Sequence, residues 1–401
     1  MTVTPQDTDP APAYPMDRTC PYRMPPGYAS LRERRPLSRV TLDDGREVWL
    51  VSGNAEGRAL LRDPRLSSNT SRLGFPCLAG QQVPELPLIG TDDPEHARQR
   101  RLLASGFGIR RIAALRPQIE RTAEELIDAM LAQGNSAELV RAYSLPLACD
   151  ASFAFLGVPR EERHLLKDLV RSTLLGSPEE ETHASGHAFT GIQDYLRELI
   201  ARKERTPGDG LIDELLAGHP VRDEADRDQL VLLCTVLATG GNETTSATIA
   251  TSVFALLEHP EQAGMLRTDS TLTAGAVEEL TRFISAGDAL LRAAVADIEI
   301  AGHTIRAGDG VIISTMLMNR DPGAWDDPDV LDIRRRASRH VAFGYGIHQC
   351  VGQNLARAEM EIALNTLLRR VPTLRLAVPA GQVRSTPAAT QEGVAELPVT
   401  W

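Results

Sequence analysis

The segment Phe343-Gly-Tyr-Gly-Ile-His-Gln-Cys-Val-Gly352 is the most informative part of this chain. Its three glycines permit positive φ angles and let the backbone lie close to a large flat partner. Cys350 comes just before a helical pattern that begins at Gln353, where the helix dipole and free N–H groups favour a thiolate. Such a thiolate is a suitable axial ligand for a redox-active iron. The alternative, a buried cysteine in a glycine-rich turn, must also account for Phe343 and His348.

Composition limits what the protein does. The chain has 401 residues, of which 42% are hydrophobic and 24% charged, as in ordinary globular proteins. Lys and Arg number 43 against 54 Asp and Glu, and this net charge of −11 argues against non-specific nucleic-acid binding. The five cysteines are scattered without Cys-x-x-Cys spacing, which excludes a disulfide framework and a zinc-finger site. Any functional cysteine therefore acts singly.

No segment of the sequence is typical of a targeting signal or a membrane span. Residues 1–12 are polar, without a basic region followed by an apolar one. The longest apolar run, residues 230–237, is much shorter than the ~20 residues that a membrane helix needs. We therefore expect a cytoplasmic protein with no membrane or nucleic-acid partner.

The apolar periodicity predicts a mainly α fold with a minor β portion. Asp93 followed by Pro94 is a typical helix start. The longest predicted helix is apolar on most faces and should run through the middle of the molecule. We expect helices over residues 94 onward, 113–131, 183–202, 229–258 and 350–370, a hairpin over 40–51, and a β-rich patch over 293–314.

The chain shows no repeat, low-complexity linker or break in composition. We therefore expect residues 1–18 to be a flexible arm and residues 19–401 to form a single domain.

The run Gly240-Gly-Asn-Glu-Thr-Thr245 lies in the middle of the long predicted helix. Each glycine costs about 1 kcal/mol relative to alanine in a helix, so the pair needs a reason. The hydroxyl of Thr244 can reach the carbonyl of Gly240, and helices kink or widen at such places. A groove edged by Glu243 and Thr244 would suit proton delivery to dioxygen. A close helix contact with a solvated glutamate explains the segment equally well.

The Cys350 segment fills every position of Phe-Gly-x-Gly-x-His-x-Cys-x-Gly, the cysteine-loop pattern of the cytochrome P450 superfamily. The resemblance covers nearly the whole chain and is strongest to the soluble bacterial class. It implies the cytochrome P450 fold, with a long central helix over the haem and a cysteine loop leading into the proximal helix.

The resemblance implies haem b (iron protoporphyrin IX) as the cofactor, with Cys350 as the iron ligand. The two haem propionates need cationic donors. Taken singly each candidate donor is typical of a surface, whereas the set in this order favours propionate binding. The family positions that contact the cofactor correspond here to His96, Arg100, Arg292, His348, Phe343, Gly344, Gly352 and Gly240.

Two further motifs are similar to those of the family. The family's oxygen-activation pattern gives Glu243 and Thr244 the catalytic, proton-delivering roles. Glu279 and Arg282 match the Glu-x-x-Arg motif, and Arg335 would close a buried triad with a structural role. Without the resemblance, an i, i+3 pair is usually a surface ion pair worth a few tenths of a kcal/mol.

The resemblance implies a haem-thiolate monooxygenase. It would place one oxygen atom from O2 on a small, lipophilic natural product, in secondary-metabolite tailoring, or on a xenobiotic. No flavin or nicotinamide motif is present, so electrons should come from a ferredoxin and its NAD(P)H-dependent ferredoxin reductase. We expect a monomer. Arg98, Arg101 and Arg357 are candidates for meeting an acidic partner, although an ordinary solvated surface fits each of them as well.

Two other functions stay open. One is haem-thiolate chemistry other than monooxygenation: peroxide-driven oxidation, phenol coupling or nitrogen-oxide reduction. The other is a non-catalytic haem sensor or docking module. Glu243 and Thr244 argue against both, because neither needs a proton relay to dioxygen.

The resemblance indicates the substrate pocket less sharply. Residues 283–291 lack a proline common in relatives and carry Asp288, which we interpret as a structural or solvated aspartate. The substrate-pocket candidates are Val236, Thr239, Leu290, Leu291 and Ala389, with the loop 75–89.

Overall fold

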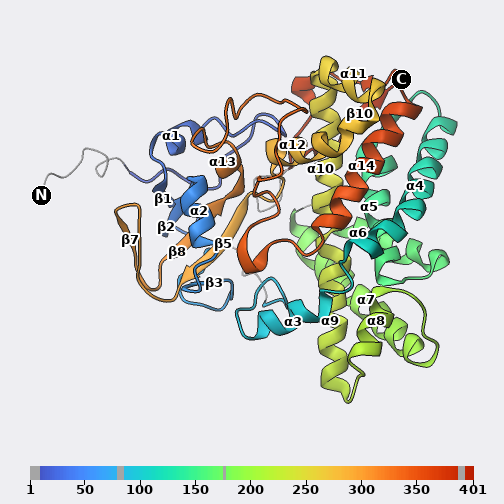
Figure 1. Ribbon diagram of the computed structural model, residues 1–401, viewed down its shortest axis with the longest axis horizontal. Helices are drawn as coiled ribbons and strands as arrows, with labels where there is room; N and C mark the ends of the chain where they lie inside the picture. Colours follow the sequence, from blue (N-terminus) through green and yellow to red (C-terminus); the bar gives the residue numbers. More distant parts are fainter. Residues whose placement is uncertain (1–9, 79–84, 175–177, 387–392) are drawn as a thin grey trace, which may run out of the picture.

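The computed structural model describes residues 10–78, 85–174, 178–386 and 393–401. Helices make up the larger part, at the right of Figure 1, and a five-stranded sheet lies at the left. The predicted mainly α fold with minor β structure is therefore confirmed. The helices are α1 (Tyr28–Glu33), α2 (Asn54–Leu60), α3 (Glu95–Leu103), α4 (Ile109–Ala132), α5 (Leu145–Leu156), α6 (Arg163–Leu174), α7 (Pro178–Arg205), α8 (Leu211–Gly218), α9 (Glu224–Gly240), α10 (Asn242–Glu258), α11 (Pro260–Thr268), α12 (Thr273–Ile284), α13 (Thr315–Asn319) and α14 (Gln353–Arg370).

The main sheet has the strand order β1-β2-β8-β5-β3, in which only β2 and β8 run parallel. Its strands are β1 (Leu37–Thr41), β2 (Glu47–Val51), β3 (Leu66–Ser67), β5 (Ala289–Ala294) and β8 (Gly310–Ser314). Trp49 and Val51 of β2 enter one apolar cluster and Val48 and Leu50 another. Both faces of the sheet are therefore packed, as the period-2 alternation of strand side chains allows.

Two smaller sheets complete the β structure. They are formed by β4 (Ser136–Glu138), β10 (Pro398–Thr400) and β9 (Arg375–Leu376), and by β6 (Ile298–Ile300) with β7 (His303–Ile305). The predicted hairpin over residues 40–51 is confirmed as β1 and β2, with Gly45 at φ 80° in its turn. The predicted β patch begins earlier than expected, so Arg292 lies inside β5 and not at its start.

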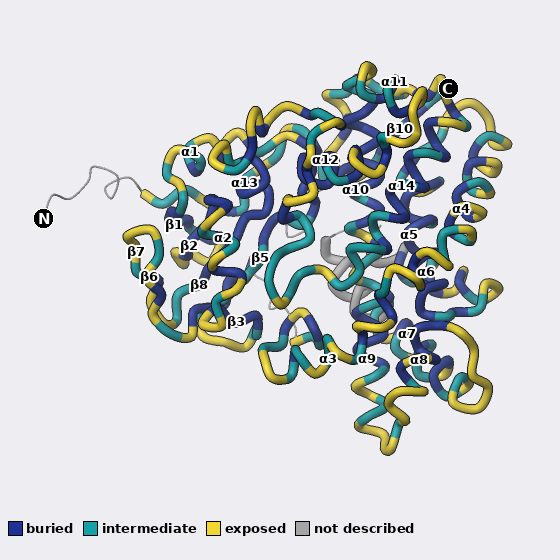
Figure 2. The backbone as a smooth tube through the Cα atoms, in the orientation of Figure 1, coloured by how far each residue is buried: buried dark blue, intermediate teal, exposed yellow. Residues whose placement is uncertain are grey.

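The helical part is built around α10 and α14, which pack on each other and are largely buried in Figure 2. The largest cluster of buried apolar side chains includes residues from Tyr22 to Val399. Among the described residues, no helix has the length and apolarity to cross a membrane.

The central helix is interrupted, and this corrects the prediction of one helix over residues 229–258. Helix α9 ends at Gly240 and α10 begins at Asn242, with Gly241 between them. The Thr244 hydroxyl donates to the Gly240 carbonyl at 3.2 Å, and the Asn242 amide donates to the Ala238 carbonyl at 2.6 Å. Side chains that compete for backbone carbonyls beside two glycines disfavour a regular helix here. The paired glycines predict an irregularity at this position, and the helix is interrupted there, at Gly241.

The N-terminal arm differs from the expected loose segment. Residues 1–9 lie outside the described part of the chain, but Ala13 bridges to Thr41 of β1 and Tyr14 is buried against Tyr28. An aromatic ring buries enough apolar surface to hold a short arm in place. The arm is therefore tied to the sheet well before residue 18.

Asp288 fixes the start of β5. It is 1% exposed and accepts hydrogen bonds from the Tyr28 hydroxyl at 2.9 Å, the Ser314 hydroxyl at 2.6 Å and the Met316 N–H at 2.7 Å. A buried carboxylate with three donors is satisfied within the protein. Asp288 therefore has the structural role favoured by its sequence context, and it positions the strand that carries Arg292.

Candidate haem site

The cysteine loop is held in a fixed shape above the start of α14. Gly344 and Gly346 have φ angles of 71° and 76°, which side chains with a Cβ rarely adopt. A Cβ at Gly346 would also lie 2.3 Å from the Leu61 carbonyl oxygen. The Cys350 N–H donates to the Phe343 carbonyl at 2.8 Å, which closes the loop. Gly352, in contrast, has a φ of −82°, so the expectation of positive φ fails at this glycine.

The side chain of Cys350 is accessible, yet many protein atoms surround it, and this burial raises its pKa. The N–H groups of Gly352 and Gln353 and the nearby guanidinium of Arg100 lower the pKa and partly offset that effect. The N–H groups at the helix start therefore favour a thiolate, as predicted, but their effect on the pKa is smaller than that of burial. A further cation near the sulfur would be needed to lower the pKa below its ordinary value.

A cluster of cationic donors lies beside this thiol. The imidazole rings of His96, on α3, and His348, in the cysteine loop, are 4.0 Å apart between centroids. Among the described residues, Nε2 of His96 and Nε2 of His348 are buried without a hydrogen-bond partner, while Nδ1 of His96 lies 3.5 Å from a carboxylate oxygen of Asp93. Burial, and then the charges of Arg292, His96 and Arg100, lower the pKa of His348 to about 3. The neighbouring cations therefore add to burial in disfavouring a charge on the His348 ring.

The two arginines of this cluster form no ion pair with a carboxylate of the described residues. Among those residues, Arg292 donates to the Leu291 carbonyl at 2.8 Å, and burial lowers its pKa to about 10 although the charge of Asp92 opposes the shift. Burial also lowers the pKa of Arg100. Within the described residues neither guanidinium forms an ion pair. Buried cations of this kind call for an anion from outside the chain. The four donors, which we call the cation cluster, have the chemistry that two propionates require.

The interrupted central helix presents an open face. Gly240 is exposed, and a Cβ placed on it would meet no heavy atom within 4 Å. Glu243 is exposed and Thr244 half-buried on the first turn of α10. The structure therefore brings a carboxylate and a hydroxyl to the break, as the sequence indicated.

The predicted pocket residues come from α9 and β5. Val236 is buried, and the Thr239 hydroxyl donates to the Thr235 carbonyl at 2.9 Å. Leu290 and Leu291 are half-buried on β5, and the Cδ1 atom of Leu290 lies 3.9 Å from a Cβ built on Gly344. Strand β5 thus reaches the cysteine loop. Ala389 and part of the loop 75–89 lie outside the described residues.

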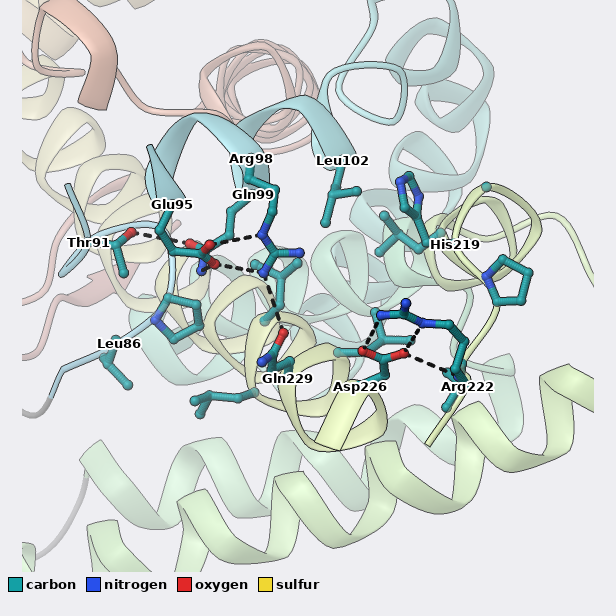
Figure 3. A pocket seen from close by; sticks show the side chains of 18 of the residues that line it. Leu86, Thr91, Glu95, Arg98, Gln99, Leu102, His219, Arg222, Asp226 and Gln229 are labelled. Atoms are coloured by element: carbon teal, nitrogen blue, oxygen red, sulfur yellow. Dashed lines mark hydrogen bonds and ion pairs between the residues drawn. The ribbon is translucent and has the colours of Figure 1, made fainter. Parts of the chain in front are cut away.

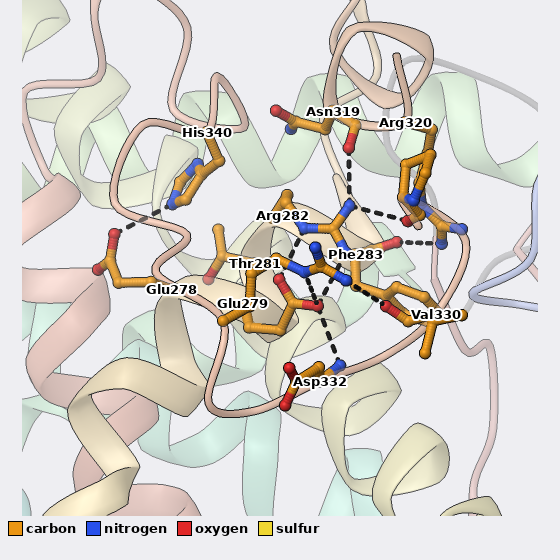
Figure 4. A network of polar contacts seen from close by, with 12 residues as sticks. Glu278, Glu279, Thr281, Arg282, Phe283, Asn319, Arg320, Val330, Asp332 and His340 are labelled. Atoms are coloured by element: carbon orange, nitrogen blue, oxygen red, sulfur yellow. Dashed lines mark hydrogen bonds and ion pairs between the residues drawn. The ribbon is translucent and has the colours of Figure 1, made fainter. Parts of the chain in front are cut away.

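The three members of the predicted triad meet in the core, as Figure 4 shows for its centre. Glu279 and Arg282 are fully buried and form two hydrogen bonds, of 2.7 and 2.8 Å. Arg335 donates to Glu279 at 3.1 Å. Backbone carbonyls, including those of Asn319 and Pro328, accept the remaining donors. We call Glu279, Arg282 and Arg335 the closed triad, because each charge has its partners within the chain.

A second network behind the loop was not predicted. Glu278 binds Arg357 at 2.5 Å and lies 3.3 Å from the His340 ring. Burial raises the pKa of Glu278, but His340 and Arg357 outweigh it and lower the pKa to about 2. The Arg357 guanidinium lies 4.6 Å from the centroid of the Phe343 ring. These residues hold the first residue of the cysteine loop, and the pairing of positions 278 and 357 has no local signal in the sequence.

The three arginines proposed as contacts for an acidic partner differ in exposure and in ion-pair partners. Arg357 is engaged by Glu278 and Phe343, so it is not a free surface cation. Arg98 forms an exposed ion pair with Glu95 at 2.7 Å. Arg101 is exposed.

Comparison with known proteins agrees with this geometry. Residues 83–374 match the cytochrome P450 family. The chain is 50% identical to pentalenic acid synthase of Streptomyces avermitilis, over 97% of both chains, and 46% identical to vitamin D3 dihydroxylase of Streptomyces griseolus, over 100% of this chain and 99% of the other. The crystal structure of CYP105D6 superposes with a TM-score of 0.91 at 46% identity, covering 98% of this chain and 99% of the other.

These relatives match nearly the whole length of the chain. The extent of the family match and the sulfur-and-cation geometry point to one cofactor and one chemistry. The chain belongs to the cytochrome P450 family and is a haem-dependent monooxygenase.

Proposed function

We propose that this monooxygenase oxidises a small, lipophilic natural product or foreign compound, with Cys350 as the iron ligand. The observation that carries the assignment is the cation cluster beside a single accessible thiol. His96, Arg100, Arg292 and His348 would hold the propionates, and Gly344 would let the loop backbone lie close to the macrocycle. When bound, haem supplies the redox chemistry that activates dioxygen.

The chain's own contribution to oxygen activation is proton delivery at the break between α9 and α10. The hydroxyl of Thr244 is held by the Gly240 carbonyl, so its oxygen has a defined position at the open face. Glu243, one residue earlier on the same turn, is exposed and can exchange protons with solvent. We assign proton transfer to Thr244 and proton supply to Glu243.

The substrate side of the proposal rests on apolar lining and on the relatives. Val236 and Leu290 offer apolar surface, whereas Leu291 packs against the apolar cluster on the other face of the sheet. Thr239 offers one hydroxyl that is already bonded to its own helix. Two relatives are named pentalenic acid synthase and vitamin D3 dihydroxylase, and these names support a small lipophilic substrate. A neutral molecule of this kind loses little on leaving water.

The electrons would come from a ferredoxin and its NAD(P)H-dependent reductase, with the protein acting as a cytoplasmic monomer. Arg101 stays as a candidate contact for the acidic partner, because it is exposed close to the cation cluster on α3. Arg98 and Arg357 are weaker candidates because both already have carboxylate partners.

The decisive experiment measures coupling in wild type, Thr244→Ala and Thr244→Ser, supplied with a ferredoxin, its reductase, NADPH and a substrate found by spin-shift titration. We expect Thr244→Ala to keep consuming dioxygen while product per dioxygen falls by about tenfold or more and hydrogen peroxide accumulates. Thr244→Ser should restore much of the coupling, because it keeps the hydroxyl. Unchanged coupling in Thr244→Ala would remove this residue from the mechanism, and full activity with peroxide alone would favour a peroxide-driven enzyme.

A further inference from the structure

A second pocket lies away from the cysteine loop. It has a volume of about 720 Å³ and is bounded by α3, by α9 and by the connection from α8 to α9. Figure 3 shows Arg98 and Leu102 of α3 above Gln229 and Asp226 of α9, with His219 at one end. We call this space the outer pocket. Its volume lies within the ~300–1,000 Å³ typical of sites for small organic molecules.

The outer pocket is distinct from the haem site because α3 uses different faces for the two. Glu95, Arg98, Gln99 and Leu102 line the outer pocket, at the spacing of one helical face. His96 and Arg100, four residues apart, form the neighbouring face and belong to the cation cluster. Helix α3 therefore separates the two sites and contributes side chains to both.

The floor of the outer pocket is apolar. Leu102 and Leu230 are half-buried, and Leu215 and Leu233 are each only 4% exposed. Leucines from three helices meet here without filling the space between them. Apolar surface left open in this way favours an apolar ligand, by about 25 cal/mol for each Å² that the ligand covers.

Four of the charged side chains that line the outer pocket, from α3, α9 and the connection before α9, form two ion pairs. The fifth, Glu85, is exposed and accepts a hydrogen bond from the Asn69 amide at 3.4 Å. Glu95 binds Arg98 at 2.7 Å, and Asp226 binds Arg222 at 2.8 Å. Neither pair leaves a whole charge for a phosphate or an ammonium group.

The uncharged polar side chains that line the pocket are Thr91, Gln99, His219 and Gln229. The Gln99 amide is engaged by the Leu88 N–H, the Thr91 hydroxyl and Glu95. The Gln229 oxygen accepts from Arg98 at 3.4 Å, and among the described residues the Gln229 nitrogen has no acceptor. This nitrogen can donate to a carbonyl or hydroxyl oxygen.

We propose that the outer pocket is a second binding site, for a neutral, largely apolar small molecule that carries a hydrogen-bond acceptor. Leu102, Leu230 and Leu233 contact its apolar body and the Gln229 amide binds its oxygen. Because the ligand lies between α3 and α9, it packs against the two helices that lead to the cation cluster and to the break at Gly241. The site is therefore placed to influence the haem site without overlapping it.

Nile red is a suitable probe, because it is neutral, apolar and carries a carbonyl oxygen. Its binding to the haem-loaded protein is measured by equilibrium dialysis, and the haem absorption spectrum is recorded on the same samples. We compare wild type with Gln229→Trp, which fills the rim, and Leu102→Trp, which fills the floor. Gln133→Trp is the matched control, an exposed glutamine at the end of α4 that does not line the pocket.

We expect wild type and Gln133→Trp to bind Nile red equally, and Gln229→Trp to bind it at least about tenfold more weakly with an unchanged haem spectrum. Leu102→Trp should show the same loss; if it fails to fold, Gln229→Trp still decides. The proposal is overturned if wild type binds no Nile red, or if Gln229→Trp binds it as tightly as wild type does. Neither result bears on Cys350 or on the coupling experiment, so failure here leaves the proposed function in place.

Discussion

The closed triad and the cation cluster are two groups of buried and half-buried charged side chains, and they differ in how their charges are satisfied. In the closed triad, Glu279 balances Arg282 and Arg335 at 2.7–3.1 Å, and backbone carbonyls accept the other donors. In the cation cluster, Arg292 has one backbone carbonyl and no carboxylate among the described residues, and Nε2 of His96 is buried there without a partner. The first group is complete without a ligand, and the second is not.

The difference separates structural from functional charge. A buried charge is tolerated only when partners repay its loss of hydration. Where the chain provides the partners, the charges stabilise the fold. Where it provides none, the desolvation cost of the charge is not compensated until an anionic ligand binds. Mutations that act on stability in one group should therefore act on cofactor binding in the other.

The largest effect is expected from Glu279→Gln, which leaves two buried guanidinium groups without their carboxylate. We expect the free energy of unfolding to fall by about 3–5 kcal/mol, the usual cost of breaking a buried ion pair on one side. Urea unfolding followed by circular dichroism measures it. A loss below about 1 kcal/mol would mean that the triad is not the structural unit described here.

The second prediction concerns Glu278, whose pKa of about 2 lies below its ordinary value of 4.5. A pKa that is lowered on folding contributes stability above the unfolded pKa and loses it as the pH falls towards the folded pKa. This shift corresponds to about 3 kcal/mol at pH 7 and to about half of that near pH 3. The stability difference between wild type and Glu278→Gln should shrink accordingly between the two pH values. A difference that does not change with pH would contradict the role given to its ionised form.

Arg292→Gln probes the open group. Loss of one charge-assisted hydrogen bond should weaken haem binding by about 1.5–3 kcal/mol, or about 10- to 150-fold. The apoprotein should not lose stability, because a buried cation without a counter-charge is removed. Haem transfer to a scavenger protein and urea unfolding of the apoprotein measure the two effects. A marked loss of apoprotein stability would place Arg292 with the closed triad.

The smallest effect is expected from Arg98→Ala. Glu95 and Arg98 repeat the Glu-x-x-Arg spacing of the closed triad, at a similar distance of 2.7 Å, but with side chains 45% and 50% exposed. Exposed pairs contribute about 0–1 kcal/mol, and we expect a change below about 0.5 kcal/mol by urea unfolding. A loss comparable to that of Glu279→Gln would show that spacing, and not burial, sets the energy.

These two pairs also show what sequence reasoning can and cannot provide. The cysteine loop, the break at the paired glycines and the donors His96 and Arg100 are local patterns, and the structure contains the break and the contact of His96 with His348 of the loop. Burial of one Glu-x-x-Arg pair and exposure of the other depend on the packing of distant segments. The link between Glu278 and Arg357 spans 79 positions, and without it Arg357 was interpreted as a surface cation.

The prediction of a flexible N-terminal arm is wrong for residues 13 and 14 for the same reason. Its polar, proline-rich sequence is typical of a loose segment, whereas burial of Tyr14 beside Tyr28 depends on where the sheet lies. The outer pocket is equally invisible in the sequence, because α3 and α9 are more than a hundred residues apart.

The central claim is that Cys350 provides the thiolate beside the cation cluster. The most direct test is the carbon monoxide difference spectrum of the reduced protein for wild type, Cys350→Ser and Cys20→Ser, the last being a half-buried cysteine outside the site. We expect the spectrum of thiolate-bound haem in wild type and Cys20→Ser and its complete loss in Cys350→Ser. A thiolate spectrum that persists in Cys350→Ser would contradict the account.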